Sequence, residues 1–429
     1  MFGAKGDGAA DDTAALQAAL DSGRNLRLRA RTYNHTGLVL RHSGQSIAGE
    51  GTHQSVLRNT TAGKPSISVN PHVHHVALTG FRVTRSVPEA PGGHGVSFPN
   101  INAQAVLENL FSDSNHAGFH LGGTDYSTVT NCIAERNWGA GFYLFNAGAV
   151  PCQWYVSNCL SQKNNGPGLE IRSVAGGGAT QTTVGDIAGF QTFANGSYGV
   201  CAFGSAAVPV HGVRLRACYL GTDANSEVYL DTYGGYHTMD GVFTELAGRD
   251  PTGRDLAAPA SGLGYGFQAT ANNRDVTLSG CTAVGNSLSG VGTAAQTTVV
   301  NGSRCDDNGR ALVDGNRAGV RQVSAAARVL VNGTACGAAG GTAQQHGVLA
   351  EDGANCAVVG CDLSGNAADT VLAAVNTAKM TLVGNLPFQH RNVLPGGLTL
   401  GEPAGGPAAP GCINASGEVC RNNVAYTRP

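Results

Sequence analysis

A short motif recurs through most of this sequence: an asparagine, up to three further residues, a glycine, and then apolar residues in alternate positions. Five clear copies begin at Asn115, Asn137, Asn164, Asn195 and Asn286. Self-similarity with a period of about 20–50 residues is typical of solenoid proteins. A unit of this size without a helix cannot bury its own apolar side chains, whereas stacking on neighbouring units buries them.

A second constant segment lies upstream of each asparagine. Four copies of it end in cysteine, and in all four the motif asparagine follows the cysteine by five residues: Val129–Cys132, Val156–Cys159, Leu278–Cys281 and Val358–Cys361. Each repeat therefore combines about three short strands, one tight turn of fixed size and one loop of variable size. We predict an all-β chain folded as a right-handed parallel β-helix of about a dozen coils. Unrelated hairpin turns of a β-sandwich, the alternative, would not keep the five-residue offset.

Asparagine suits the turn of such a coil for two reasons. Strands of neighbouring coils lie about 4.8 Å apart, so the asparagines of successive turns form a row in which each amide can bond to the next. Asparagine also tolerates the left-handed backbone conformation, which we expect at these turns. Weaker copies of the motif at Asn225 and Asn308 extend the row.

The first residues differ from the repeat. Asp11 or Asp12 is expected to cap a short helix formed by the Ala/Leu run over residues 14–20, and this helix would cover the open edge of the first coil. The predicted organisation is a capping segment over 1–35, the β-helix over 36–386 and a Gly/Pro-rich cap or tail over 387–429. Because the sequence opens abruptly inside a motif, we expect a trimmed N-terminus.

The opening segment Phe2–Thr13, followed by Arg31–Tyr33 and Ile47–Gly51, resembles the entry segment of the pectate-lyase-like superfamily, which includes polygalacturonases and the tailspike depolymerases of bacteriophages. The resemblance implies a β-helix, a polysaccharide ligand, an extracellular (secreted or virion-associated) location and, as in tailspikes, a homotrimer. It does not fix the reaction, since one fold hosts many functions. Gly93–Gly95 matches a Gly-His-Gly motif of polygalacturonases, but their other motifs are missing, so we interpret His94 as part of the coil pattern.

Charge and cysteine content exclude several classes of protein. The net charge is −2, with 27 basic and 29 acidic residues, so the chain lacks the basic excess of a nucleic-acid-binding protein. No apolar run approaches the ~20 residues of a membrane span. Of the 12 cysteines, the four at the repeat position are expected to be small buried apolar residues, and Cys412 and Cys420 are the best disulfide candidates. No C-x-x-C zinc spacing occurs, and no metal site is predicted.

In this architecture the strand after the variable loop, together with that loop, forms the usual ligand groove, and alternate residues of the strand point outward. Outward carboxylates lie about 4.8 Å apart on adjacent coils and about 6.6 Å apart along a strand. These distances suit the roughly 5–5.5 Å of retaining and 6.5–9.5 Å of inverting glycosidases.

The segment from residue 186 to residue 245 is the densest in suitable side chains. We predict catalytic roles for its carboxylates, Asp186, Asp231, Asp240 and Glu245. We predict sugar binding by aromatic and basic residues in and before this segment, Trp154, Tyr155, Arg214, Tyr233, Tyr236 and His237. Glu170 lies on a different strand, and we interpret it as a surface residue.

Three function classes follow. The preferred hypothesis is a cofactor-free, glycoside hydrolase-type depolymerase that cleaves a bacterial surface, capsular or extracellular polysaccharide with paired carboxylates. The alternative is a polysaccharide lyase or uronate epimerase, for which Arg214, His237 or Tyr233 could serve as base or cation and calcium could take part. The third is a non-catalytic carbohydrate-binding module. New reducing ends without an unsaturated product would indicate hydrolysis.

Overall fold

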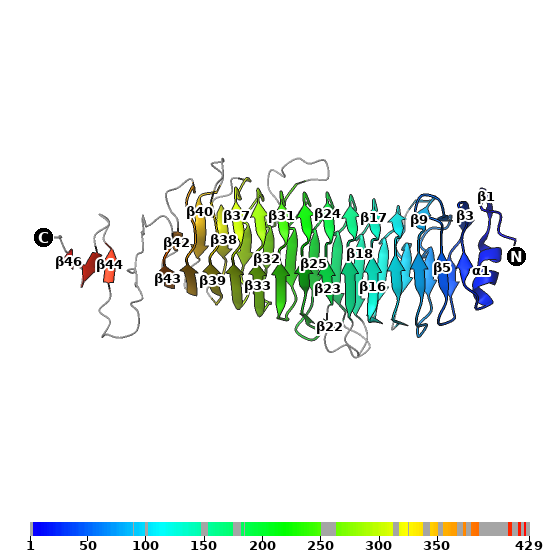
Figure 1. Ribbon diagram of the computed structural model, residues 1–429, viewed down its shortest axis with the longest axis horizontal. Helices are drawn as coiled ribbons and strands as arrows, with labels where there is room; N and C mark the ends of the chain where they lie inside the picture. The colour runs from blue at the N-terminus through cyan, green and yellow to red at the C-terminus, as the bar shows by residue number, and fades with distance from the viewer. Residues whose placement is uncertain are drawn as a thin grey trace. The chain divides into compact units, whose positions relative to one another are not determined.

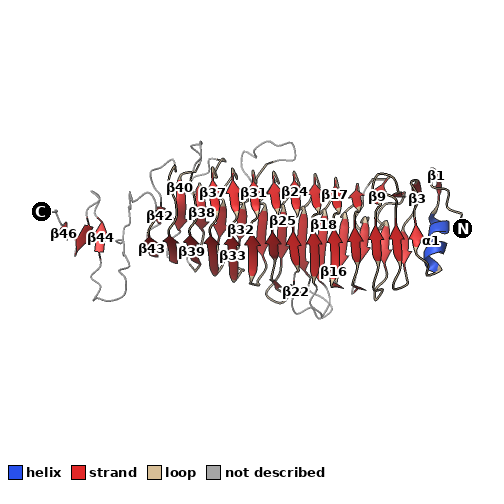
Figure 2. Cartoon of the chain, in the orientation of Figure 1, coloured by secondary structure: helices blue, strands red, loops and turns tan. Residues whose placement is uncertain are grey.

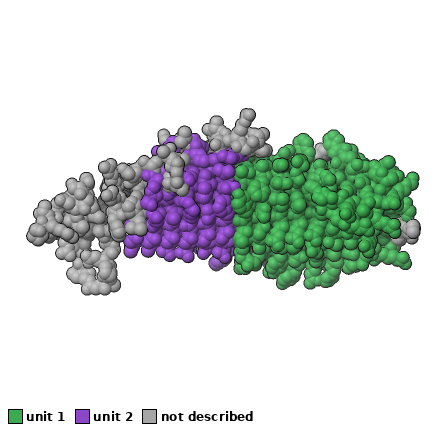
Figure 3. Space-filling view, turned by 45° about the horizontal axis from the view of Figure 1, so that its top comes forward, with its two compact units in different colours: residues 1–224, 232–234, 250–253 green, residues 225–231, 235–249, 254–429 purple. Residues whose placement is uncertain are grey.

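The computed structural model divides into two compact units, coloured separately in Figure 3. Unit 1 comprises Met1–Ala224, Thr232–Gly234 and Asp250–Gly253, and unit 2 comprises Asn225–Asp231, Gly235–Arg249 and Arg254–Pro429. The structure describes residues 3–425 except 89, 99–101, 147–152, 175–181, 184, 250–262, 312–316, 325, 338–343, 351–354, 367–371, 375–378, 386–410, 414–418 and 422–423.

Unit 1 is built from three parallel sheets, because each repeat supplies three short strands (Figures 1 and 2). We name the sheets A, B and C; in each coil the chain runs from a B strand to an A strand, then to a C strand, and through a loop to the next B strand. Sheet A contains β1 (Asp7–Asp11), β3 (Thr32–His35), β6 (Val56–Asn59), β9 (Arg82–Arg85), β13 (Phe111–Asp113), β17 (Ile133–Glu135), β20 (Leu160–Gln162), β24 (Gln191–Phe193) and β28 (Tyr219–Gly221). Sheet B contains β2 (Leu26–Arg27), β5 (Ser46–Ala48), β8 (Ala77–Thr79), β12 (Val106–Glu108), β16 (Ser127–Thr130), β19 (Trp154–Ser157), β23 (Asp186–Ala188) and β27 (Arg214–Arg216). Sheet C contains β4 (Leu38–Leu40), β7 (Ile67–Val69), β10 (Val96–Phe98), β14 (Phe119–Gly122), β18 (Phe142–Asn146), β21 (Leu169–Ser173) and β25 (Val200–Phe203).

Unit 2 repeats the same plan. Its A strands are β31 (Phe243–Glu245), β34 (Thr282–Val284) and β37 (Arg304–Asp306). Its B strands are β30 (His237–Asp240), β33 (Asp275–Ser279), β36 (Thr297–Asn301), β39 (Arg328–Asn332), β41 (Asn355–Val359) and β43 (Lys379–Val383). Its C strands are β29 (Val228–Asp231), β32 (Phe267–Ala269), β35 (Val291–Thr293), β38 (Ala318–Gln322), β40 (His346–Ala350) and β42 (Leu372–Ala374). The chain winds through about 11 turns, which confirms the predicted right-handed parallel β-helix.

Three small sheets lie outside the coils. In unit 1, the loops between C and B strands form two-stranded parallel ladders, β11 (Asn102–Ala103) with β15 (Thr124–Asp125) and β22 (Thr182–Thr183) with β26 (Val210–His211). In unit 2, β44 (Gly411–Ile413), β45 (Val419–Arg421) and β46 (Val424–Ala425) form an antiparallel sheet. Cys412 and Cys420 are register partners in that sheet, but their side chains lie outside the described part, so their disulfide stays a prediction.

The corner between the B and A strands has a constant form from β8 to β28. Two residues connect the strands, of which the first has a positive φ and the second is buried. In the cysteine-containing repeats these are Asn131 (φ 54°) with Cys132, and Asn158 (φ 52°) with Cys159. The left-handed conformation favours asparagine or glycine at the first position, and the tight corner directs the second side chain into the core. The prediction that the repeat cysteines are small buried residues is confirmed, because all four are free thiols at most 1% exposed.

The predicted row of asparagines is present at the corner between the A and C strands. In unit 1 the Nδ2 atom of Asn137 donates to Oδ1 of Asn164 at 2.9 Å, and Nδ2 of Asn164 donates to Oδ1 of Asn195 at 2.9 Å. Asn195 donates in turn to Oδ1 of Asp223 at 2.8 Å, so an aspartate occupies the place that we expected Asn225 to take. In unit 2, Nδ2 of Asn286 donates to Oδ1 of Asn308 at 2.9 Å.

The conformation of the turn differs from the prediction in one respect. The positive φ belongs to the residue before each asparagine of this row, which we call the asparagine ladder, and not to the asparagine itself. Examples are Arg136 (φ 52°) and Lys163 (φ 55°). The asparagines are therefore retained for their hydrogen bonds. The glycine that follows is needed for space, because a Cβ atom on Gly141 would lie 2.0 Å from Oγ of Ser161 in the next coil.

The helix α1 (Thr13–Asp21) lies at the start of unit 1 and buries Leu16, Ala19 and Leu20 (Figure 1). Its Gln17 side chain exchanges hydrogen bonds with the backbone of Val39 in β4, the first strand of sheet C, at 2.9 Å in both directions. The helix thus satisfies a sheet edge that would otherwise be open, as predicted. Asp12 occupies the N-cap position without capping the helix, because its carboxylate accepts hydrogen bonds from the backbone of Lys5 and Gly6.

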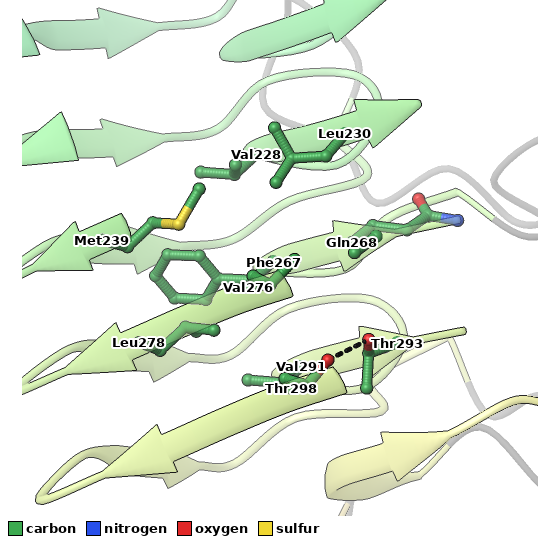
Figure 4. Close-up of a pocket in the computed structure, with 12 residues that line it drawn as sticks. Val228, Leu230, Met239, Phe267, Gln268, Val276, Leu278, Val291, Thr293 and Thr298 are labelled. Carbon is green, nitrogen blue, oxygen red and sulfur yellow. Dashed lines mark hydrogen bonds between the residues drawn. The ribbon is translucent and has the colours of Figure 1, made fainter. Parts of the chain in front are cut away.

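The interior of unit 2 contains a small cavity between B and C strands, lined mainly by aliphatic side chains and by Phe267 (Figure 4). Its volume is about 10 Å³, which is the size of a single water molecule. Three polar side chains line it: Oγ1 of Thr293 and Oγ1 of Thr298 bond to each other at 2.7 Å, and Oε1 of Gln268 accepts a hydrogen bond from Oγ of Ser226 at 2.6 Å. The cavity is therefore a packing defect and too small for a sugar.

Candidate functional site on the outer faces of the coils

The outer face of sheet B in unit 1 carries part of the predicted groove. Val156 pairs with Ile187 in the next coil, which places Tyr155 beside Asp186, and Asp186 pairs with Arg214 in the coil after that. Tyr155, Asp186 and Arg214 therefore form one outward row at the strand spacing of about 4.8 Å.

The members of this row are accessible. Tyr155 is 42% exposed, and Arg214 is also exposed. Oδ2 of Asp186 accepts a hydrogen bond from Nη2 of Arg216 at 3.0 Å, and the two side chains are 31% and 54% exposed. An ion pair with that much solvent contact contributes at most about 1 kcal/mol to stability, so Asp186 is not held in place for the sake of the fold.

Two predicted sugar-binding residues are in the core. Trp154 immediately precedes Tyr155 in β19 and is 1% exposed, because consecutive strand residues point to opposite faces. His237 begins β30 and is also 1% exposed. Neither ring can stack on a sugar from this position, so both assignments are corrected. By contrast, Tyr233 and Tyr236 are 37% and 73% exposed in the loop after β29.

The predicted carboxylates of unit 2 lie on three different sheets. Asp231 ends the C strand β29, Asp240 ends the B strand β30, and Glu245 ends the A strand β31. Oδ1 of Asp231 accepts hydrogen bonds from Oγ1 of Thr270 at 2.8 Å and from Nδ2 of Asn272 at 2.7 Å. The expectation that these three carboxylates gather on one groove face is therefore wrong.

The sequence interpretation also missed one accessible aromatic residue near the row. Tyr126 lies directly before β16 and is 55% exposed, on the side of the coil where Tyr155 lies in the following coil. It belongs to a variable loop and repeats nowhere, so no periodic signal could have identified it.

The outer face of sheet C in unit 1 holds a denser group of titratable and aromatic side chains. His120, Tyr143 and Glu170 are register partners on the consecutive strands β14, β18 and β21. The rings of His120 and Tyr143 are stacked, with centroids 5.3 Å apart and an interplanar angle of 13°. His94 stacks on the other side of His120 at 4.0 Å. This group includes Glu170, which we had interpreted as a surface residue, and His94, which we had assigned to the coil pattern alone.

Burial changes the protonation of this group. It lowers the pKa of His94 to about 3 and that of His120 to about 4, so both imidazoles are neutral near pH 7. It raises the pKa of the Glu170 carboxyl and of the Tyr143 phenol, although Arg172 opposes the shift of Glu170. Oγ of Ser97 lies 3.2 Å from Nδ1 of His120, within hydrogen-bond distance.

No metal centre emerges from these faces. Across the residues that the structure describes, no three His, Cys, Asp or Glu side chains come together in a way that could hold a metal ion. Calcium therefore stays an expectation that applies only if the chain is a lyase or an epimerase.

Comparison with known proteins agrees with the fold. The family model described as "Right handed beta helix region" matches residues 67–215, which lie in unit 1. No curated protein matches the chain. The family-model match confirms the β-helix fold that the resemblance to the pectate-lyase-like superfamily implied.

Several solved structures resemble the chain at low identity. Tailspike protein 3 of bacteriophage CBA120 matches with a TM-score of 0.61 and 13% identity, over 99% of this chain and 68% of that chain. The catalytic unit of the GH87 α-1,3-glucanase of Streptomyces thermodiastaticus matches with a TM-score of 0.51 and 15% identity, over 90% and 67%. The A-module of mannuronan C-5 epimerase AlgE4 of Azotobacter vinelandii matches with a TM-score of 0.51 and 14% identity, over 94% and 98%.

A fourth structure, ORF18 of Geobacillus virus E2, matches with a TM-score of 0.54 and 15% identity over 66% of this chain. The chain spans only 56% of the length of that protein. At these identities the likeness concerns the fold alone.

Proposed function

We propose that this chain acts on a polysaccharide that it holds along the outer face of sheet B in unit 1. The observation that carries the proposal is the outward row of Tyr155, Asp186 and Arg214 on three consecutive coils. A tyrosine ring offers a flat apolar face to a sugar ring, while a carboxylate and a guanidinium bond its hydroxyl or acidic groups. The row repeats at about 4.8 Å, so a polymer lying along it meets a new side chain at every coil.

The proteins with similar structures support this proposal. They include a tailspike protein, an α-1,3-glucanase and a mannuronan epimerase, of which the latter two are named for polysaccharide substrates. We propose a bacterial surface, capsular or extracellular polysaccharide as the substrate, an extracellular or virion-associated location and a homotrimeric state. In the described residues, no helix reaches the length and apolarity that crossing a membrane requires.

We propose glycoside hydrolysis as the reaction, with Asp186 as one of the carboxylates. Hydrolysis needs a second carboxylate within about 5–9.5 Å. On the described outer face of sheet B in unit 1, Glu108 is the other carboxylate, but its strand lies three coils from that of Asp186, about 14 Å along the stack. Asp186 is therefore the catalytic candidate of this face, and each of the other predicted carboxylates is tested through its own variant.

A second reaction class is supported by the two arginines beside Asp186. Arg214 and Arg216 place guanidinium groups next to the row, where they could neutralise the carboxylate of a uronate residue. Such neutralisation is needed for proton abstraction next to that carboxylate, as in an elimination or an epimerisation. Tyr155 would be the adjacent proton-transfer group.

The test incubates the protein with a panel of acidic and neutral bacterial polysaccharides. Hydrolysis gives new reducing ends without an unsaturated product, elimination gives both, and epimerisation gives neither but changes the proton NMR spectrum. Asp186→Asn should lower the rate by about 10²–10⁴-fold if its carboxyl transfers a proton. Glu108→Gln, three coils away on the same face, serves as the control and should retain full activity.

Separate variants examine the other carboxylates: Asp231→Asn, Asp240→Asn and Glu245→Gln. Full activity in these variants and in Asp186→Asn would refute the carboxylate assignment. Polymer binding without any chemical change would leave the chain as a carbohydrate-binding module. Analytical ultracentrifugation of the same preparation tests the homotrimer, which a monomer mass would refute.

A further inference from the structure

Two parallel rows of side chains cover the outer face of sheet C in unit 1. One row contains His120, Tyr143 and Glu170, as described above. In the other, Phe145 pairs with Arg172 on the next coil, and Arg172 pairs with Phe203 on the coil after that. The rings of Tyr143 and Phe145 lie 5.3 Å apart, so the two rows form one continuous surface.

Arg172 is the accessible cation of this surface, and its orientation is fixed by two contacts. Its Nε atom donates to Oε1 of Glu170 at 2.7 Å, and its guanidinium carbon lies 4.9 Å from the centre of the Phe203 ring. The Arg172 side chain is 44% exposed, whereas Glu170 is only 13% exposed. The guanidinium is thus held from two sides while nearly half of the side chain faces solvent.

We propose that this face of sheet C is a second carbohydrate site, which takes a sugar ring bearing an anionic substituent. The apolar face of the sugar packs against Tyr143 and Phe145, and the anion binds the guanidinium of Arg172. A carboxylate, a sulfate or a phosphate would satisfy the same donors, because all three accept hydrogen bonds from a planar guanidinium. The site lies on a different sheet from the Tyr155 row and does not depend on the function proposed for that row.

Glu170 regulates this site, because its carboxylate competes with the ligand for Arg172. When Glu170 is ionised, the two side chains form an ion pair; when it takes up a proton, Arg172 retains its full charge for the ligand. Burial raises the pKa of Glu170, which brings this protonation nearer to neutral pH. Ligand binding should therefore tighten as the pH falls from 7 to 5.

The other titratable groups facing Glu170 do not change charge in that range. Tyr143 on β18 and Cys201 on β25 both have pKa values raised above their ordinary alkaline values by burial, so they stay neutral. His120 and His94, further along the surface, have pKa values of about 4 and about 3 and are also neutral between pH 5 and 7. A change in affinity over this range is thus assigned to Glu170.

The test measures the binding of four probes by titration calorimetry at pH 5, 6 and 7: an oligogalacturonate tetrasaccharide, a carrageenan tetrasaccharide, mannose 6-phosphate and neutral maltotetraose. These carry a carboxylate, a sulfate, a phosphate and no charge, respectively. We expect at least one anionic probe to bind about tenfold more tightly than maltotetraose. Arg172→Gln should abolish this difference, whereas Glu170→Gln should tighten binding several-fold at pH 7 and remove the pH dependence for the carboxylate and sulfate probes. The phosphate probe is compared at pH 7 only, because its own charge changes near pH 6.

Arg136→Gln is the matched control, because Arg136 is also an exposed arginine paired with a carboxylate, that of Glu135, but it directly follows strand β17 of sheet A and lies outside both proposed sites. It should leave binding of these probes unchanged. Circular dichroism confirms that each variant is folded. Equal binding of neutral and anionic probes, no binding of any of them, or equal effects of Arg172→Gln and Arg136→Gln would refute the proposal. A chain that neither cleaves nor epimerises any polysaccharide of the panel would refute the reaction proposed for sheet B but not this binding site.

Discussion

An asparagine amide buried in a corner of the coil must satisfy both its donors and its acceptor without water. Asn164 does so completely. Its Nδ2 group lies within hydrogen-bond distance of Oδ1 of Asn195, Oγ of Ser161 and the carbonyl oxygen of Ala134, while its Oδ1 accepts from Asn137. Each ladder residue therefore connects its own coil to both neighbours.

Replacing Asn164 by alanine should lower the free energy of unfolding by about 2–3 kcal/mol, because buried groups of three coils lose their partner. Asn165→Ala is the control, since the neighbouring asparagine is exposed and its replacement should change stability by less than about 0.5 kcal/mol. Urea denaturation followed by circular dichroism measures both values. Equal losses in the two variants would show that the ladder bonds contribute nothing specific.

For single residues, the sequence predicts which side chains bond to each other better than it predicts their backbone conformation. The chemistry of an amide that can donate and accept identified the ladder, and the fixed offset from the cysteines identified its register. The position of the left-handed residue was predicted one place too late, because asparagine tolerates that conformation but here does not adopt it. Trp154 and Tyr155 illustrate the same point. The sequence shows two adjacent aromatic residues, but which of them faces outward depends on which residues of the strand point into the core.

Among the elements, α1 covers the first coil at the start of unit 1 together with β1, which pairs with β3. Leu16, Ala19 and Leu20 are buried beneath it, while Ala18 lies on its exposed side. The backbone of β4 would otherwise present unpaired donors and acceptors to a second molecule. The sequence predicted this element well, because a short Ala/Leu helix stands out from the β repeat.

Leu20→Asp should detach α1 and cause concentration-dependent self-association, because a charge cannot be buried beneath the helix without a partner. Ala18→Asp places the same charge on the exposed face of the same helix and should leave the protein monodisperse relative to wild type. Dynamic light scattering over a concentration series compares the two. Identical behaviour of both variants would mean that α1 does not protect the sheet edge.

The candidate site was harder to predict than the elements. We predicted one cluster from Asp231, Asp240 and Glu245 because fewer than fifteen residues separate them in sequence. Over that length, however, the chain passes through strands of all three sheets. Conversely, His120, Tyr143 and Glu170 are more than twenty residues apart in sequence and lie side by side. The exact length of each variable loop determines which residues of successive coils become register partners. That length differs from coil to coil and cannot be derived from the repeat.

For the molecule as a whole, buried neutral histidines determine how stability depends on pH. Burial lowers the pKa of His35 to about 3, and His94 and His120 are shifted in the same direction. In the unfolded chain these groups titrate near 6.5. Between pH 6.5 and about 4 the unfolded state therefore binds more protons than the folded state, and the folded state loses stability as the pH falls.

We expect the free energy of unfolding to be nearly constant between pH 7 and about 8 and to fall below pH 6.5, by as much as about 1.4 kcal/mol per pH unit for each buried histidine. His35→Gln should make this slope shallower by about 1 kcal/mol per pH unit between pH 6 and 5, whatever its effect at pH 7. His72→Gln, at an exposed histidine, should leave the slope unchanged. Urea midpoints at half-unit pH intervals give the slopes, and parallel curves for His35→Gln and wild type would contradict the assignment.

The constant two-residue corner between B and A strands fixes which residues of the A strand point into the core and which point outward. One additional residue there would exchange the inward and outward positions of the strand that follows, and with it the core of that coil. The passage from a C strand to the next B strand has no such constraint, since it holds 4 residues after Gly122 and 12 after Ser173. A loop between a C strand and the next B strand can therefore be replaced by a loop of another length. The replacement changes the side chains next to the outer faces, while the strands of the solenoid keep their register.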